Sequence, residues 1–76
     1  MEAYKDRFIN EFNQLVVRIN KLERIIMSAK ENTLDFNLSC PIDLLEKQLA
    51  IMKDYRAILL QRATIEDIKI GGYHGL

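Results

Sequence analysis

The sequence predicts an all-α protein: a two-helix antiparallel hairpin that assembles into a homo-oligomeric helical bundle. Composition is the first observation, because the 76 residues hold only one proline, Pro41, and three glycines, which all lie in the last six positions. Long stretches are therefore free of helix breakers. The second observation is an apolar stripe at helical spacing near the N-terminus. The third is an apolar arc in the C-terminal half that is too wide for one partner helix to cover.

The first helix is expected over residues 2–30. Apolar residues recur there at steps of three and four, which places them within roughly an 80° arc at 100° per residue. Such a narrow stripe is typical of a helix that packs along one other helix. The members of the stripe are Tyr4, Phe8, Phe12, Leu15, Ile19, Leu22 and Ile26.

Residues 31–40 lose this period and form the connection. They gather Asn, Asp, Thr and Ser, whose side chains compete for backbone hydrogen bonds. Pro41 suits the first turn of a helix, where its missing N–H is not needed, and Asp43 suits the positive end of the helix dipole. The second helix is therefore expected over about residues 41–67, and two long helices with a short connection favour an antiparallel hairpin.

Residues 68–76 differ from both helices. Ile68, Lys69 and Ile70 alternate as in a short strand, and glycines follow them. We expect this segment to be either a frayed C-terminal tail or an arm that docks on a neighbouring subunit.

The apolar residues of the second helix span about 220°, of which one partner helix covers only about 100–140°. One group closes the hairpin: Leu45, Leu49, Met52, Leu59 and Ala63. The other repeats every seven residues and would face water in a monomer, so we expect it to form an oligomer interface. It consists of Leu44, Ile51, Ile58 and Ile65. The alternative is that part of this strip packs under the connection and the tail. The oligomer can be a dimer, a tetramer or larger.

A polar row with the same spacing, Gln48, Tyr55 and Arg62, lies between the two apolar groups. Such groups need partners, because an unpaired buried amide or guanidinium costs several kcal/mol. One interpretation is that Gln48 and Arg62 pair across the oligomer seam and fix its register. The other is a ligand cleft at a subunit interface. There Tyr55 stacks on a planar ring, Arg62 forks to a phosphate and Gln48 reads a base edge.

Three more residues are candidates for ligand binding. Arg18 flanks the aromatic stripe of the first helix, and Tyr73 and His74 lie in the glycine-rich tail. Each has a plainer interpretation: Arg18 as a solvated flank charge, and the tail residues as part of a disordered end.

Composition narrows the function classes. Eleven basic and eleven acidic residues give a net charge of zero, which argues against a nucleic acid polymer as partner. One cysteine and one histidine exclude a disulfide framework and leave almost no metal ligands. No catalytic pattern, membrane span or signal peptide is visible. We expect an intracellular, non-enzymatic protein without cofactor, metal or membrane partner.

Two strings of the sequence resemble a family of small helical-hairpin proteins from crAss-like and other tailed phages. The resemblance covers about residues 4–65, and its second string is the more specific. The strings are Tyr4-x-x-Arg7-x-x-x-Glu11-x-x-x-Leu15-x-x-Arg18-Ile19 and Gln48-Leu49-x-x-Met52-x-x-Tyr55-x-x-x-Leu59-x-x-Arg62. The resemblance implies a phage protein that is expressed in the host bacterial cytoplasm.

Small oligomeric phage proteins of this kind include sponges that sequester cyclic-nucleotide signals of the CBASS and Thoeris defences. This similarity implies a ligand such as the cyclic dinucleotide cGAMP or a cyclic ADP-ribose type molecule, bound at subunit interfaces and not cleaved. The alternative is a helical adaptor that lays its apolar face on a host protein and inhibits it. A structural or nucleic-acid-associated phage component is disfavoured by the zero net charge. The tyrosine-plus-arginine row separates the first two, because an adaptor would carry aliphatic anchors there.

Overall fold

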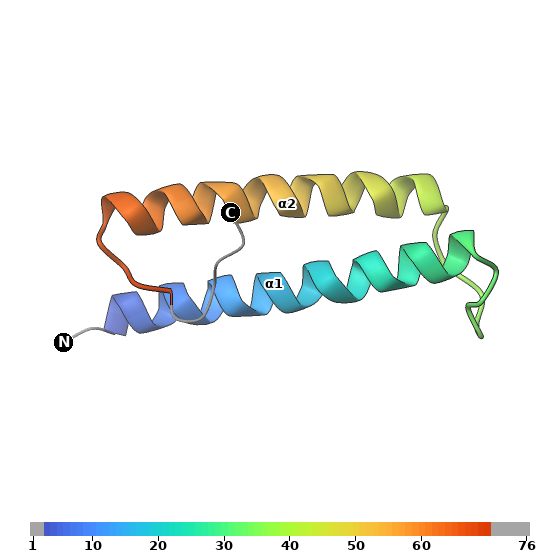
Figure 1. The fold of residues 1–76 in the computed structure, drawn as a ribbon, viewed down its shortest axis with the longest axis horizontal. Coiled ribbons are helices and arrows are strands. Elements are labelled where there is room, and N and C mark those ends of the chain that lie inside the picture. Colours follow the sequence, from blue (N-terminus) through green and yellow to red (C-terminus); the bar gives the residue numbers. More distant parts are fainter. Residues whose placement is uncertain (1–2, 71–76) are drawn as a thin grey trace.

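The computed structural model describes residues 3–70, and these form the two helices α1 (Ala3–Lys30) and α2 (Ile42–Ile65). The helices lie side by side and run in opposite directions, and no strand occurs between residues 3 and 70 (Figure 1). The predicted all-α hairpin is therefore confirmed. Neither helix combines the length and the apolar character that crossing a membrane requires.

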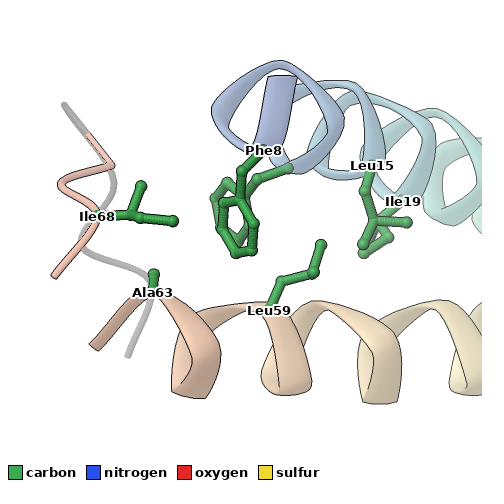
Figure 2. Packing of buried hydrophobic residues seen from close by; sticks show 7 residues of the cluster. Phe8, Leu15, Ile19, Leu59, Ala63 and Ile68 are labelled. Carbon is green, nitrogen blue, oxygen red and sulfur yellow. The ribbon is translucent and has the colours of Figure 1, made fainter. Parts of the chain in front are cut away.

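The apolar stripe of α1 forms most of the core. Phe12 and Ile19 are completely buried, and three further stripe residues are nearly so. From α2, Leu59 and Ala63 pack against them (Figure 2). The fully formed part of the core is therefore the end of the hairpin where α1 begins and α2 ends. Toward the connection the packing is looser, and the α2 residues Leu45, Leu49 and Met52 are half-buried there.

Helix α1 ends in a Schellman motif. The backbone N–H of Thr33 donates to the carbonyl oxygen of Ser28 at 2.9 Å, and that of Asn32 donates to Ala29 at 3.2 Å. Asn32 adopts a left-handed conformation with φ of 59°, which asparagine tolerates better than most residues. The last carbonyl groups of α1 are thus satisfied before the chain enters the connection.

Helix α2 begins one residue after Pro41. Pro41 itself has φ of −59° and ψ of 144°, so its backbone is extended and it precedes the first helical turn instead of lying in it. Its carbonyl oxygen already accepts the N–H of Leu44 at 3.1 Å and of Leu45 at 3.3 Å. The helix therefore starts at Ile42, where the expectation placed its start at the proline.

Helix α2 ends at Ile65 in a second Schellman motif, two residues before the predicted end at about residue 67. Asp67 is left-handed with φ of 57°, and the N–H of Ile68 donates to the carbonyl oxygen of Ala63 at 2.8 Å. This turn carries the Ile68 side chain into the core, where it is 5% exposed (Figure 2). Ile70 packs on the same cluster. Ile68 and Ile70 thus dock on the hairpin of their own chain. Tyr73 and His74 lie outside the described residues.

A candidate ligand site along one edge of the hairpin

Polar side chains of the two helices meet along one edge of the hairpin in steps of seven residues. Arg62 contacts Tyr4, and Tyr55 contacts Glu11. Because the helices are antiparallel, the second pair lies seven residues later on α1, at Glu11 instead of Tyr4, and seven residues earlier on α2, at Tyr55 instead of Arg62. The same register places Arg18 level with Gln48. The polar edge, as we name it, comprises Tyr4, Glu11, Gln48, Tyr55, Arg62 and Glu66.

The end of the polar edge near the core is a closed network of three side chains. The Arg62 guanidinium donates from Nη2 to the Tyr4 hydroxyl at 2.6 Å and from Nε to Glu66 Oε2 at 3.1 Å. The Tyr4 hydroxyl in turn donates to Glu66 Oε1 at 2.6 Å. Since Tyr4 lies in the first turn of α1 and Arg62 in the last turn of α2, the network joins the two helices at the end of the hairpin where α1 begins and α2 ends.

Hydrogen bonding in this network shifts the pKa of each member. The bond from Tyr4, followed by the bond from Arg62, holds the pKa of the Glu66 carboxyl below its ordinary value of 4.5. The same carboxylate raises the pKa of the Tyr4 hydroxyl, which is held as a donor, and it also raises the pKa of Arg62. At neutral pH the site therefore holds a full guanidinium charge, a full carboxylate charge and a protonated tyrosine.

Tyr55 occupies the next step of the polar edge. Its hydroxyl donates to Glu11 Oε2 across the hairpin, and this bond, more than partial burial, raises the pKa of the Tyr55 hydroxyl. The side chain nevertheless remains exposed. An exposed ring that is held by its hydroxyl offers a fixed surface on which a planar group can stack.

The remaining predicted ligand residues are less closely grouped. Gln48 lies beside a shallow apolar hollow on α2 that Leu44, Ile51 and Met52 also line. Arg18 lines a different hollow, on α1, together with Val17 and its neighbours. The structure thus brings Tyr55 and Arg62 onto one edge of the hairpin. Gln48 lies one further heptad along α2, and Arg18 lies one further heptad along α1 from Glu11.

Sequence reasoning missed three members of the polar edge: Tyr4, Glu11 and Glu66. The sequence pattern places Tyr4 in the apolar stripe of the first helix and assigns Glu11 no contact with the second helix. Glu66 lies four residues after Arg62, which is the spacing of an ion pair on one helix face. This spacing could have predicted the contact between Glu66 and Arg62. Within its own chain, the Arg62 guanidinium therefore has Glu66 and Tyr4 as hydrogen-bond partners.

The predicted interface strip is exposed in the hairpin. Leu44, Ile51, Ile58 and Ile65 are between 52% and 81% exposed. At 100° per residue the strip lies roughly 50° around α2 from the row Gln48, Tyr55 and Arg62. Polar edge and apolar strip therefore border each other along the whole helix.

The opposite edge carries two ion pairs, Lys53 with Glu23 at 2.7 Å and Lys30 with Glu46. They are also seven residues apart on each helix, so contacts between the antiparallel helices recur at heptad steps on both edges. All four side chains are at least 40% exposed, and ion pairs with this much access to solvent contribute little to stability. Among residues 3–70 no group of His, Cys, Asp and Glu side chains is placed to hold a metal ion.

Comparison with known proteins adds one finding. The family model described as Sequestin matches residues 2–65, which include both helices and all of the polar edge except Glu66. No curated protein and no solved structure shows significant similarity to the chain. Because the match extends over most of the sequence, the chain belongs to the Sequestin family.

Proposed function

We propose that this chain is a phage anti-defence sponge, which sequesters a cyclic-nucleotide immune signal in the host cytoplasm without cleaving it. The signal is a cyclic dinucleotide such as cGAMP or a molecule of the cyclic ADP-ribose type. The family name supports the coarser part of this proposal, since it indicates sequestration of a partner or ligand. The observation that carries the proposal is the polar edge, where a tyrosine ring and a guanidinium are held one heptad apart beside an exposed apolar strip.

Each group on the polar edge fits one part of a nucleotide. Arg62 supplies a permanent charge and a planar fork that matches phosphate oxygens. Tyr55 supplies a stacking surface for a base, and the Gln48 amide can donate to and accept from a base edge. Seven residues of helix separate these groups in turn, about 10 Å along the axis, which is the scale of a nucleotide.

The proposal includes a second copy of the chain on the strip Leu44, Ile51, Ile58 and Ile65. A row of four large aliphatic side chains, each more than half exposed, is unusual on a monomer of this size. A two-helix unit is also marginally stable alone. Because the strip borders the polar edge, a copy packed there would wall in Gln48, Tyr55 and Arg62. The ligand would then lie at the subunit interface.

A helical adaptor that inhibits a host protein is the second candidate. The same aliphatic strip favours it, since an exposed helical face with a seven-residue repeat fits a groove or a helix of another protein. The two candidates differ in what covers the strip and in whether Tyr55 and Arg62 contact a small molecule.

A thermal-shift screen of the purified protein against a panel of cyclic nucleotides tests the proposal. A ligand present at 100 times its Kd stabilises the folded state by about 2.7 kcal/mol, which is a shift of many degrees for so small a domain. The bound nucleotide should be recovered intact after the protein is heat-denatured. If no cyclic nucleotide raises the melting temperature, the sponge is excluded and the adaptor takes its place.

A conservative substitution then locates the site. Arg62→Lys keeps the charge but loses the fork, so we expect the nucleotide to bind about tenfold more weakly. Arg24→Lys is the matched control, because Arg24 is exposed on α1 and belongs to neither the polar edge nor the core. Equal affinities for wild type and Arg62→Lys would remove Arg62 from the ligand site.

A further inference from the structure

We propose that Glu66 is an internal competitor for the ligand: its carboxylate occupies the Arg62 guanidinium in the free protein, and a phosphate group of the ligand displaces it. This inference rests on the proposed function, because it concerns the same guanidinium. It assigns Glu66 a regulatory role and gives Tyr4 a contact with the ligand.

The geometry around Arg62 carries the inference. Glu66 Oε2 lies 3.1 Å from Nε, and Tyr4 Oη lies 2.6 Å from Nη2. An anion that approached this side of the guanidinium would meet the same donors that the carboxylate now engages. Carboxylate and phosphate oxygens are the two acceptors that suit the arginine fork, so they compete for one place.

The position of Glu66 allows its carboxylate to move away from Arg62 and Tyr4. It is the residue that follows the last residue of α2, and its side chain is only half-buried. The C-terminal end of a helix carries negative partial charge, which disfavours a carboxylate there, and Asp67 adds a second negative charge next to it. Arg62 and Tyr4 hold Glu66 against this field. Once an anion takes its place, the carboxylate can turn into solvent without leaving a buried charge behind.

Tyr4 serves both states. Its hydroxyl accepts from Arg62 and donates its one hydrogen to Glu66 Oε1 at 2.6 Å. When a phosphate replaces the carboxylate, the same hydrogen can be donated to a phosphate oxygen. Tyr4 would therefore be a positioning residue in the free protein and a ligand contact in the complex.

The affinity of the wild type then includes the loss of the Glu66 contacts. Exposed ion pairs are weak, so removing the competitor should strengthen anion binding by about two- to fivefold. Glu66→Gln keeps the size and hydrogen-bonding ability of the side chain and removes its charge. Glu23→Gln is the matched control, since Glu23 is likewise half-buried and ion-paired but lies on the opposite edge.

Titration of wild type, Glu66→Gln and Glu23→Gln with inorganic pyrophosphate tests the inference, with the Arg62 Nε–H followed by NMR. We expect Glu66→Gln to bind two- to fivefold more tightly than wild type, and Glu23→Gln to match wild type. Equal or weaker binding by Glu66→Gln overturns the inference, as does the absence of binding to Glu66→Gln at 20 mM pyrophosphate (about the weakest affinity that such a titration detects).

A second measurement covers the case in which Glu66→Gln does not fold. In the wild type, pyrophosphate should raise the pKa of the Glu66 carboxyl toward 4.5, because displacement removes the two hydrogen bonds that lower it. An unchanged pKa overturns the inference. The proposed function fails in a different way. In that case no cyclic nucleotide binds to the wild type, although Glu66→Gln still binds pyrophosphate more tightly than the wild type does.

Discussion

The guanidinium carbon of Arg62 lies 5.0 Å from the centre of the Phe8 ring. Phe8 is buried, and it belongs to the core cluster that Leu59, Ala63 and Ile68 complete. The Arg62 guanidinium therefore packs against the best-packed part of the hairpin. It is also attracted to the Phe8 ring, because a cation interacts favourably with an aromatic face. A charged group that is already held in place loses less conformational freedom when a ligand binds.

Charge on the apolar strip should separate the copies of this chain. Ile51→Glu and Ile58→Glu each place a carboxylate at the proposed interface, so light scattering should report the mass of a single hairpin or an unfolded chain. Val17→Glu is the control, because Val17 on α1 is 51% exposed and Ile58 is 52% exposed. The interface would be disproved if both isoleucine variants kept the particle mass of the wild type.

The left-handed residue after α2 offers a stabilising substitution. Asp67 has φ of 57°, a conformation in which glycine avoids the steric cost that a side chain imposes. We expect Asp67→Gly to raise the free energy of unfolding by about 0.5–1 kcal/mol, which corresponds to a few degrees in melting temperature. Asp67→Ala should lower it. A melting temperature that falls for both variants would show that the aspartate side chain itself stabilises the turn.

The helices and the core were predictable because both depend on periodicity along the chain. A seam with steps of three and four fixes which residues of α1 are buried, and Phe12 and Ile19 are indeed fully buried. Tyr4 has the spacing of this stripe but is exposed instead of buried. It stands in the first turn of α1, where the end of α2 offers polar partners in place of apolar ones. Periodicity along one helix contains no information about what the other helix places opposite.

The polar edge could be predicted only in part for the same reason. Tyr55 and Arg62 were identified because a polar row inside an apolar arc is visible in one helix. Their partners Glu11 and Tyr4 follow from the register between the helices, which the sequence pattern leaves open by a whole heptad. The docking of Ile68 could not be predicted from periodicity either. It depends on the left-handed turn at Asp67, which directs the chain back onto the core.

Ile68 should matter as much as a residue inside a helix. It is 5% exposed and belongs to the same core cluster as Phe8 and Leu59, although it lies outside both helices. Ile68→Ala should therefore cost about 2–4 kcal/mol of unfolding free energy, which is a large share of the stability of so small a domain. Lys69→Ala, at the exposed neighbouring position, should change the stability by less than about 0.5 kcal/mol. Denaturant unfolding measures both, and equal midpoints for the two variants would contradict the docking of Ile68.

Tyrosine titration tests the contacts of the polar edge directly. The Tyr55 hydroxyl donates to the Glu11 carboxylate, and ionisation would replace this bond with repulsion, so the pKa of Tyr55 lies above 10.0. A raised pKa means that the stabilisation from this bond is fully present below pH 10 and is lost as the pH rises through the pKa of the folded state.

Glu11→Gln removes the charge, so the pKa of Tyr55 should fall toward 10.0 while that of Tyr4, which faces Glu66, stays raised. Glu66→Gln should have the opposite selectivity. NMR of the tyrosine Cζ carbons as a function of pH distinguishes the two residues. If Glu11→Gln left the pKa of Tyr55 unchanged, the ring would not be anchored across the hairpin, and its role as a fixed stacking surface would lose its support.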